Sequence, residues 1–112
     1  MSNINIAASV IEAENREELK AVETIEEKLK IAFAGARNHW MFTDEDTQFK
    51  GAIGAAMIGM EPDSEDYRRI ECELQNLRNL SAMFSGVPVD VENMLSDEYE
   101  PFGLIKMWKD AQ

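Results

Sequence analysis

Residues 16–41 read REELKAVETIEEKLKIAFAGARNHWM, and this stretch decides the fold. Apolar side chains recur in it at intervals of three and four residues, with glutamates and lysines between them. That spacing places the apolar groups on one side of an α-helix and the charged groups on the other. The stretch therefore predicts one long amphipathic helix with an apolar stripe several turns long. The stripe consists of Leu19, Val22, Ile25, Leu29, Ala32, Phe33, Ala36 and Trp40.

The segment before this stretch continues the same apolar frame. Ile4, Ala8 and Ile11 fall in the frame, but the polar residues Asn15 and Glu18 then interrupt it. Burying two polar side chains in an apolar seam is costly. Residues 4–13 are therefore either an upstream helix or the first turns of one very long helix that is interrupted on its apolar face. We favour a separate or bent N-terminal segment, or a flexible one, over residues 1–15.

Further helical signals follow the stretch. Thr43-Asp44-Glu45-Asp46 is a capping residue followed by acids, which predicts the start of a second helix. Within that helix, the sequence GAIGAAMIG at 51–59 has small residues that would let another backbone approach closely. An amphipathic pattern over 64–85 predicts a third principal helix, which Asp63 or Ser64 would cap. Short helices are expected after Asp90 and next to Pro101.

The predicted fold class is all-α. No segment alternates apolar and polar residues as a half-buried strand would, and nothing divides the chain into parts joined by a flexible linker. We expect a single helical domain over residues 1–112, built from three principal helices and one or two short C-terminal ones.

The composition limits the classes of partner. There are 22 Asp and Glu against 11 Lys and Arg, which gives a formal charge of −11 and argues against direct binding of nucleic acid or anionic lipid. The sequence has no run of about 18 apolar residues and no export signal. One cysteine, Cys72, excludes an internal disulfide and fits a reducing compartment. We expect a cytoplasmic protein that does not enter a membrane.

The chain has few residues of the types that usually act as a nucleophile or a general base, with one histidine and one cysteine. The only histidine, His39, is expected near the end of the first long helix as a cation favoured by the helix dipole. Cys72 lies between Glu71 and Glu73, whose charges disfavour a reactive thiolate. We assign no catalytic residue and expect a protein that is not an enzyme.

Metal chemistry is disfavoured by spacing. Helical magnesium-dependent nucleotide hydrolases use a paired Glu with a third Glu on the same helix, but neither Glu17-Glu18 nor Glu26-Glu27 has a Glu three residues on. A calcium loop starting at Asp44 would need glycine and glutamate at its sixth and twelfth positions, where Phe49 and Ala55 stand. No metal site and no cofactor is predicted.

The remaining hypothesis is an interaction protein. We expect an acidic helical inhibitor or adaptor that binds a protein partner, such as one with a basic nucleic-acid-binding groove. In size and charge the chain resembles small phage accessory proteins that inhibit host defence enzymes, and this resemblance implies an anti-defence role in the host cytoplasm. The predicted partner-binding acids are Glu23, Glu26, Glu27, Asp44, Glu45, Asp46, Glu65 and Asp66.

An alternative hypothesis is a protein that binds or sequesters a nucleotide or small molecule at a subunit interface. Arg37, His39, Trp40 and Lys50 gather cations and an aromatic group and form the candidate cluster. Self-association, with a dimer favoured, is expected because the long apolar stripe needs more cover than a short second helix offers.

Overall fold

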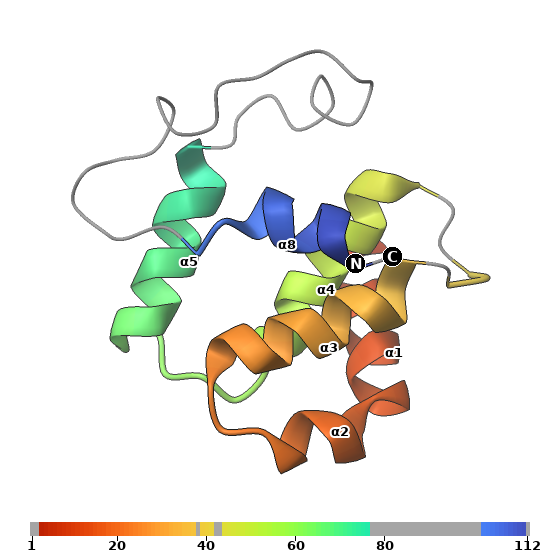
Figure 1. Ribbon diagram of the computed structural model, residues 1–112, viewed down its shortest axis with the longest axis horizontal. Helices are drawn as coiled ribbons and strands as arrows, with labels where there is room; N and C mark the ends of the chain where they lie inside the picture. Colours follow the sequence, from red (N-terminus) through yellow and green to blue (C-terminus); the bar gives the residue numbers. More distant parts are fainter. Residues whose placement is uncertain (1–2, 38, 42–43, 77–101, 112) are drawn as a thin grey trace. The chain divides into compact units, whose positions relative to one another are not determined.

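The computed structural model describes residues 3–37, 39–41, 44–76 and 102–111. Every regular element in these residues is an α-helix, which confirms the predicted all-α class, and none of these helices is long and apolar enough to cross a bilayer. The predicted helical residues 77–85, the short helix after Asp90 and Pro101 lie outside the described residues. The helices are α1 (Asn3–Glu14), α2 (Arg16–Ala21), α3 (Ile25–Arg37), α4 (Glu45–Met57), α5 (Glu65–Asn76) and α8 (Leu104–Asp110), as Figure 1 shows.

The chain divides into two units. Unit 1 comprises Met1–Gly59 and Ile105–Gln112, and unit 2 comprises Met60–Leu104. The expectation of a single domain over 1–112 stays a prediction. The two units are described separately below.

The prediction of one long helix over residues 16–41 is wrong, because the chain forms two helices there, α2 and α3. After α2, Val22 adopts an extended conformation with φ −111° and ψ 151°. Thr24 Oγ1 then accepts a hydrogen bond from the Glu27 backbone N–H at 3.2 Å, which satisfies a donor that the first turn of α3 cannot pair internally. The helix that follows ends at Arg37, before His39 and Trp40.

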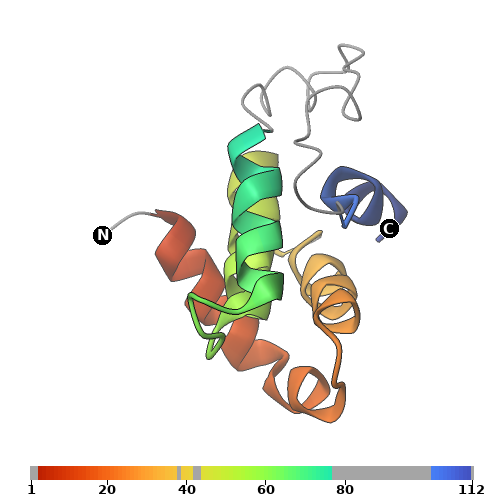
Figure 2. The same cartoon turned by 90° about the vertical axis from the view of Figure 1, so that its left-hand side faces the viewer.

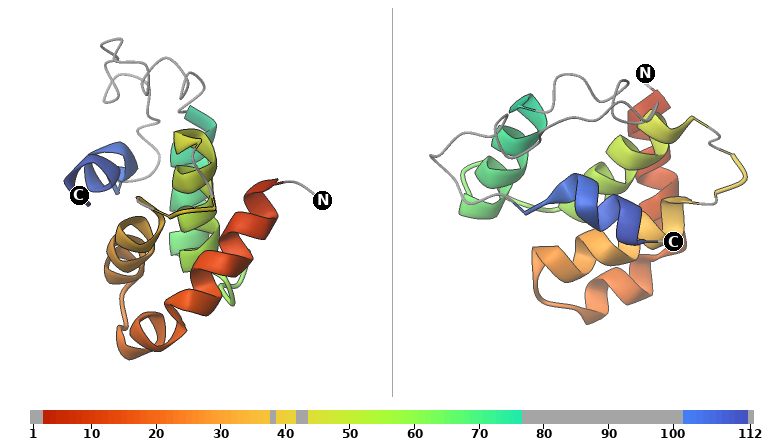
Figure 3. Two further views of the ribbon diagram at one scale, coloured as in Figure 1. Left: turned by 90° about the vertical axis from the view of Figure 1, so that its right-hand side faces the viewer. Right: turned by 45° about the horizontal axis from the view of Figure 1, so that its top comes forward.

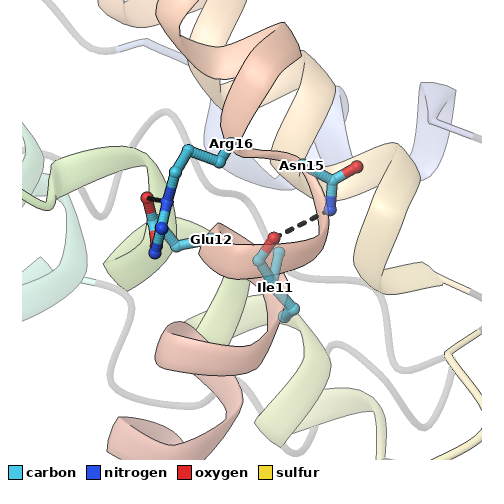
Figure 4. A network of polar contacts seen from close by, with 4 residues as sticks. All are labelled: Ile11, Glu12, Asn15 and Arg16. Carbon is cyan, nitrogen blue, oxygen red and sulfur yellow. Dashed lines mark hydrogen bonds and ion pairs between the residues drawn. The ribbon is translucent and has the colours of Figure 1, made fainter.

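The chain also changes direction between α1 and α2, at Asn15. The Asn15 side-chain Nδ2 donates to the Ile11 carbonyl at 2.8 Å, and the Arg16 guanidinium makes two bonds to the Glu12 carboxylate, at 3.0 and 2.9 Å (Figure 4). A Cβ added at Gly35 of α3 would lie 2.6 Å from Asn15 Nδ2. The corner is therefore closed by side-chain bonds and lies tightly against α3.

In unit 1, α1 and α4 pack side by side (Figure 2). A Cβ added at Gly51 would lie 2.7 Å from the Cβ of Ala7, and one added at Gly54 would lie 2.9 Å from the Cβ of Ala8. Real Cβ atoms do not come that close, so these two glycines allow the helices to approach. This confirms the close backbone approach predicted for 51–59.

An aromatic cluster forms the centre of unit 1. The rings of Phe33 and Phe49 stack with centroids 5.6 Å apart, and Trp108 meets both edge-on at 5.7 and 5.9 Å. Figure 3 shows the helix that carries Trp108, α8, beside α3 and α4. All three rings are at most 1% exposed.

The apolar stripe is largely buried within one chain. This removes the reason for which a dimer was expected, since the stripe needs no second copy to cover it, and the dimer itself stays a prediction. The buried members are Leu19, Ile25, Leu29, Ala32, Phe33 and Ala36, whereas Trp40 is exposed.

In unit 2, α5 starts at a capped turn and carries a buried carboxylate. Ser64 Oγ accepts from the Tyr67 backbone N–H at 3.2 Å, which confirms a cap at this position. Glu73 is only 3% exposed, and its carboxylate accepts from three consecutive backbone N–H groups, those of residues 102, 103 and 104, at 2.6, 3.3 and 2.6 Å.

The start predicted for the last helix, next to Pro101, is wrong by about three residues, because α8 begins at Leu104. Gly103 has φ +74°, a left-handed conformation that glycine adopts at little cost and that a helix cannot contain. The backbone N–H groups of residues 102–104 have no acceptor within α8, and they donate to the Glu73 carboxylate instead.

Candidate binding surface

The predicted acidic residues at the start of α3 differ in their exposure to solvent. Glu23 and Glu27 are exposed and Glu26 is half-buried. They lie just before and within the first turn of the helix, where carboxylates are favoured by the helix dipole. Their position is therefore explained by helix stability as well as by partner binding.

The acids around the start of α4 have partners within the chain. Asp44 caps the helix by accepting from the Thr47 backbone N–H at 3.1 Å and from the Thr47 hydroxyl at 2.8 Å. Glu45 accepts from the Trp108 indole N–H at 2.8 Å, and Asp46 pairs with Lys50 at 3.3 Å. Of the three, only Asp44 is exposed.

The last two predicted acids belong to unit 2. Glu65 is exposed, whereas Asp66 is half-buried and pairs with Arg69 at 3.5 Å. The eight acids predicted to form the binding set thus belong to two different units, and four of them hold contacts that stabilise the fold.

Two members of the predicted ligand cluster are occupied by other contacts. Arg37 donates to the Trp108 carbonyl at 2.6 Å and places its guanidinium carbon 4.6 Å from the centroid of the Trp108 ring. Lys50 pairs with Asp46 of its own helix. Their charges are therefore partly neutralised or screened within unit 1.

The third member, His39, is buried and held by two elements. Its side chain is 4% exposed, and its Nε2 lies 2.9 Å from Oε2 of Glu14 in α1. The backbone N–H of Met41 donates to Nδ1 at 3.1 Å. An Nδ1 that accepts must be unprotonated, so this arrangement assigns the proton to Nε2, which donates to Glu14. His39 also lies beyond the end of α3, which stops at Arg37, and not at the end of the helix as expected.

The fourth member, Trp40, is the most exposed large apolar side chain in the described part of the chain, at 79%. Its ring lies nearly parallel to the His39 ring, with centroids 6.0 Å apart and 19° between the planes. Its neighbour Met41 is 45% exposed. We call Trp40, Met41, His39 and Glu14 the Trp40 site.

The sequence predicted two members of this site and missed the other two. Glu14 is 25 residues from His39 and Met41 contributes through its backbone, so no local spacing connects them to the ring. The role of Trp108 was missed for the same reason, since its partner Arg37 is 71 residues away. The local signal for this site is the apolar run Trp40-Met41-Phe42, which directly follows His39 in the sequence.

The described residues contain no group of three or more His, Cys, Asp or Glu side chains placed to hold a metal ion. Every buried side-chain nitrogen and oxygen in that part of the chain has a hydrogen-bond partner. Comparison of the chain with protein-family models, with curated proteins and with solved structures finds no match in any of the three.

Proposed function

We propose that the protein is a non-enzymatic interaction protein that binds a protein partner and uses Trp40 as the anchor of its binding surface. The observation that supports this proposal is the 79% exposure of Trp40 next to the buried His39, whose ring lies nearly parallel to the indole. An exposed indole offers a large contact area, and tryptophan is enriched among the residues that dominate binding energies.

The charge of the chain indicates the kind of partner. With a formal charge of −11, the protein attracts a partner with a basic surface, such as a nucleic-acid-binding groove, and repels acidic ones. Occupation of such a groove would make the protein an inhibitor or adaptor of the phage accessory type, acting in the cytoplasm. The exposed acids Glu23, Glu27 and Asp44 would add long-range attraction.

The experiment that tests this proposal is affinity capture from a lysate of the native host, with three forms of the protein as bait. The wild type is compared with Trp40→Ala and with the triple variant Glu23/Glu26/Glu27→Gln. We expect a captured protein that is lost with Trp40→Ala, a change that typically costs about 2 kcal/mol or more at a central anchor. Ile58→Ala is the matched control, since Ile58 is a 53% exposed apolar residue elsewhere in unit 1.

The affinity for the captured protein is then measured across a salt series. A lower affinity at high salt, together with weaker binding of the triple variant, supports the acidic contribution. A flat salt response with an unaffected triple variant removes that contribution. If Trp40→Ala captures the partner as well as the wild type does, the role of Trp40 as the anchor is contradicted. A shift of the melting temperature with a nucleotide alone supports the ligand-binding alternative instead.

A further inference from the structure

The last helix of unit 1, α8, is held by side chains that surround its tryptophan. The Trp108 ring meets Phe33 and Phe49 edge-on, with centroids 5.7 and 5.9 Å away. Its indole N–H donates to Glu45 at 2.8 Å, while Arg37 donates to its carbonyl at 2.6 Å and lies over its ring. We call the four partners of Trp108, which belong to α3 and α4, the Trp108 slot. Each of these contacts joins a slot side chain to one tryptophan, as in a binding site for a helix with a single anchor.

The occupant of this slot is separated from it along the chain by a whole unit. The chain leaves unit 1 after Gly59 and returns to it at Ile105, with unit 2 between. The start of α8 is fixed within unit 2, since Glu73 accepts from the backbone N–H groups of residues 102, 103 and 104. A helix of seven residues is too short to be stable by itself. The helix α8 is therefore comparable to a ligand of the slot that follows unit 2, and it does not continue α4.

The connection from the slot to unit 2 passes through a glycine with a left-handed backbone. Gly59 follows Ile58, the residue after the last turn of α4, and has φ +89°. A Cβ built on Gly59 would meet no atom of the described residues within 4 Å, and Ile58 is 53% exposed. Glycine changes between left- and right-handed conformations at little cost. The chain can therefore change direction at Gly59 without disturbing the packing of unit 1.

We propose that the Trp108 slot also binds α8 of a second copy of this chain, so that two chains exchange their last helices. The exchange keeps every contact of the slot, because the same Trp108 meets the same Arg37 and Glu45 in either arrangement. The tether gives the chain's own α8 an effective concentration of about 1 mM, so exchange is expected when the protein folds at a comparable concentration. This inference goes beyond the proposed function, because it does not involve Trp40.

The first experiment measures whether the slot binds an α8 that is not tethered to it. A peptide of residues 102–112 is added to full-length Trp108→Ala, whose own α8 has lost its anchor. We expect saturable binding with a Kd of about 1–100 µM and a higher melting temperature. The same peptide with Trp108→Ala is the control and should have no effect. If the Trp108→Ala chain does not fold, Trp108→Phe takes its place, and a folded chain that the peptide does not stabilise overturns the proposal.

The second experiment detects the exchange with two complementary variants of the full chain. Trp108→Ala lacks the anchor and keeps the slot, whereas Arg37→Ala keeps the anchor and has a weakened slot. The two chains are unfolded in urea, mixed, refolded at about 0.5 mM and analysed by native mass spectrometry. We expect a heterodimer in excess over both homodimers. Only the heterodimer joins an intact slot to an intact Trp108 and so gains contacts that the separate chains lack.

Two results of the mixing experiment overturn the proposal. If only monomers are recovered although the peptide binds, the slot takes the α8 of its own chain alone. If the heterodimer is lost when Trp40→Ala is added to both chains, the two copies meet through Trp40 and not through the slot. The proposed function is tested separately, because capture of a partner that depends on Trp40 would stand when the exchange fails.

Discussion

At the scale of single residues, His39 is a buried ring that lies next to the exposed Trp40. Both ring nitrogen atoms of His39 make hydrogen-bond contacts, one with the Glu14 carboxylate and one with the Met41 backbone N–H. The indole ring of Trp40 lies nearly parallel to the imidazole. The sequence placed His39 and Trp40 in one cluster but not for this reason. A tautomer is set by partners that folding brings together, so it cannot be derived from the neighbouring residues in the chain.

The pKa of the Glu12 carboxyl is changed by the neighbouring Arg16. The hydrogen bond from Arg16 lowers the pKa of the Glu12 carboxyl below its usual value. A lowered folded-state pKa means that the pair stabilises the fold at pH values above the ordinary carboxyl pKa. The contribution is lost as the pH falls through the lowered value. An NMR titration of the Glu12 carboxyl should show a lower midpoint in the wild type than in Arg16→Gln, and equal midpoints would contradict the pairing.

Among the described carboxylates of unit 2, Glu73 should be the least replaceable. Replacement by Gln keeps one acceptor oxygen but turns an NH₂ group toward one of three backbone N–H groups, which leaves a buried donor unpaired. We expect Glu73→Gln to lower the free energy of unfolding by about 1–3 kcal/mol. Glu61→Gln, at an exposed position of the same unit, is the control. Urea unfolding measures both, and equal midpoints would refute the role assigned to Glu73.

At the scale of elements, the sequence predicted which faces are buried better than where helices end. Leu19 and Ile25 are both buried, although α2 ends and α3 begins between them. Apolar periodicity indicates which side of a helix is buried, and it does not indicate whether the helix is continuous. The sequence does contain a signal for the start of α3, because Thr24 and Glu27 form the pattern Thr-x-x-Glu that is typical of a helix N-terminus. The apolar periodicity continues across this point and hides the signal. The backbone N–H of the left-handed Gly103 donates to Glu73, which lies 30 residues earlier, and no local pattern records that contact.

The contact between α1 and α4 should be sensitive to a single methyl group. In Gly51→Ala the new Cβ would lie 2.7 Å from the Cβ of Ala7, and the resulting overpacking costs about 1–3 kcal/mol, more than alanine contributes through helix propensity. The double variant Ala7→Gly/Gly51→Ala removes the clash, so a double-mutant cycle should give a favourable coupling of about 1 kcal/mol. Additive effects in thermal unfolding would argue against this packing.

At the scale of the whole molecule, the all-α class follows from the sequence, whereas the candidate site does not. Amphipathic periodicity and capping residues are local, and they indicate helices wherever they occur. The Trp40 site and the Trp108 cluster join residues from distant parts of unit 1, and no pattern in one chain encodes those contacts. The predicted acids illustrate the limit, since Glu45 serves Trp108 although it was expected to face a partner.

The same substitution at the two tryptophans should separate stability from binding. Trp108→Ala removes a ring that contacts Phe33, Phe49 and Arg37, and it should cost about 3–5 kcal/mol of unfolding free energy. Trp40→Ala should change stability by about 0.5 kcal/mol or less, because that ring is mostly in solvent. Chemical unfolding followed by circular dichroism measures both, and similar losses would mean that Trp40 belongs to the core.

The position of Trp108 has a consequence for synthesis on the ribosome. Its partner Glu45 precedes it by 63 residues, so α1 to α4 leave the ribosome well before the indole that completes their core. At about 5–20 residues per second, Trp108 is synthesised roughly 4–15 s after Phe33 and roughly 3–12 s after Phe49. During that interval the nascent chain exposes an aromatic surface that the finished protein hides. Chaperones that recognise such surfaces should therefore bind this chain while it is still being translated.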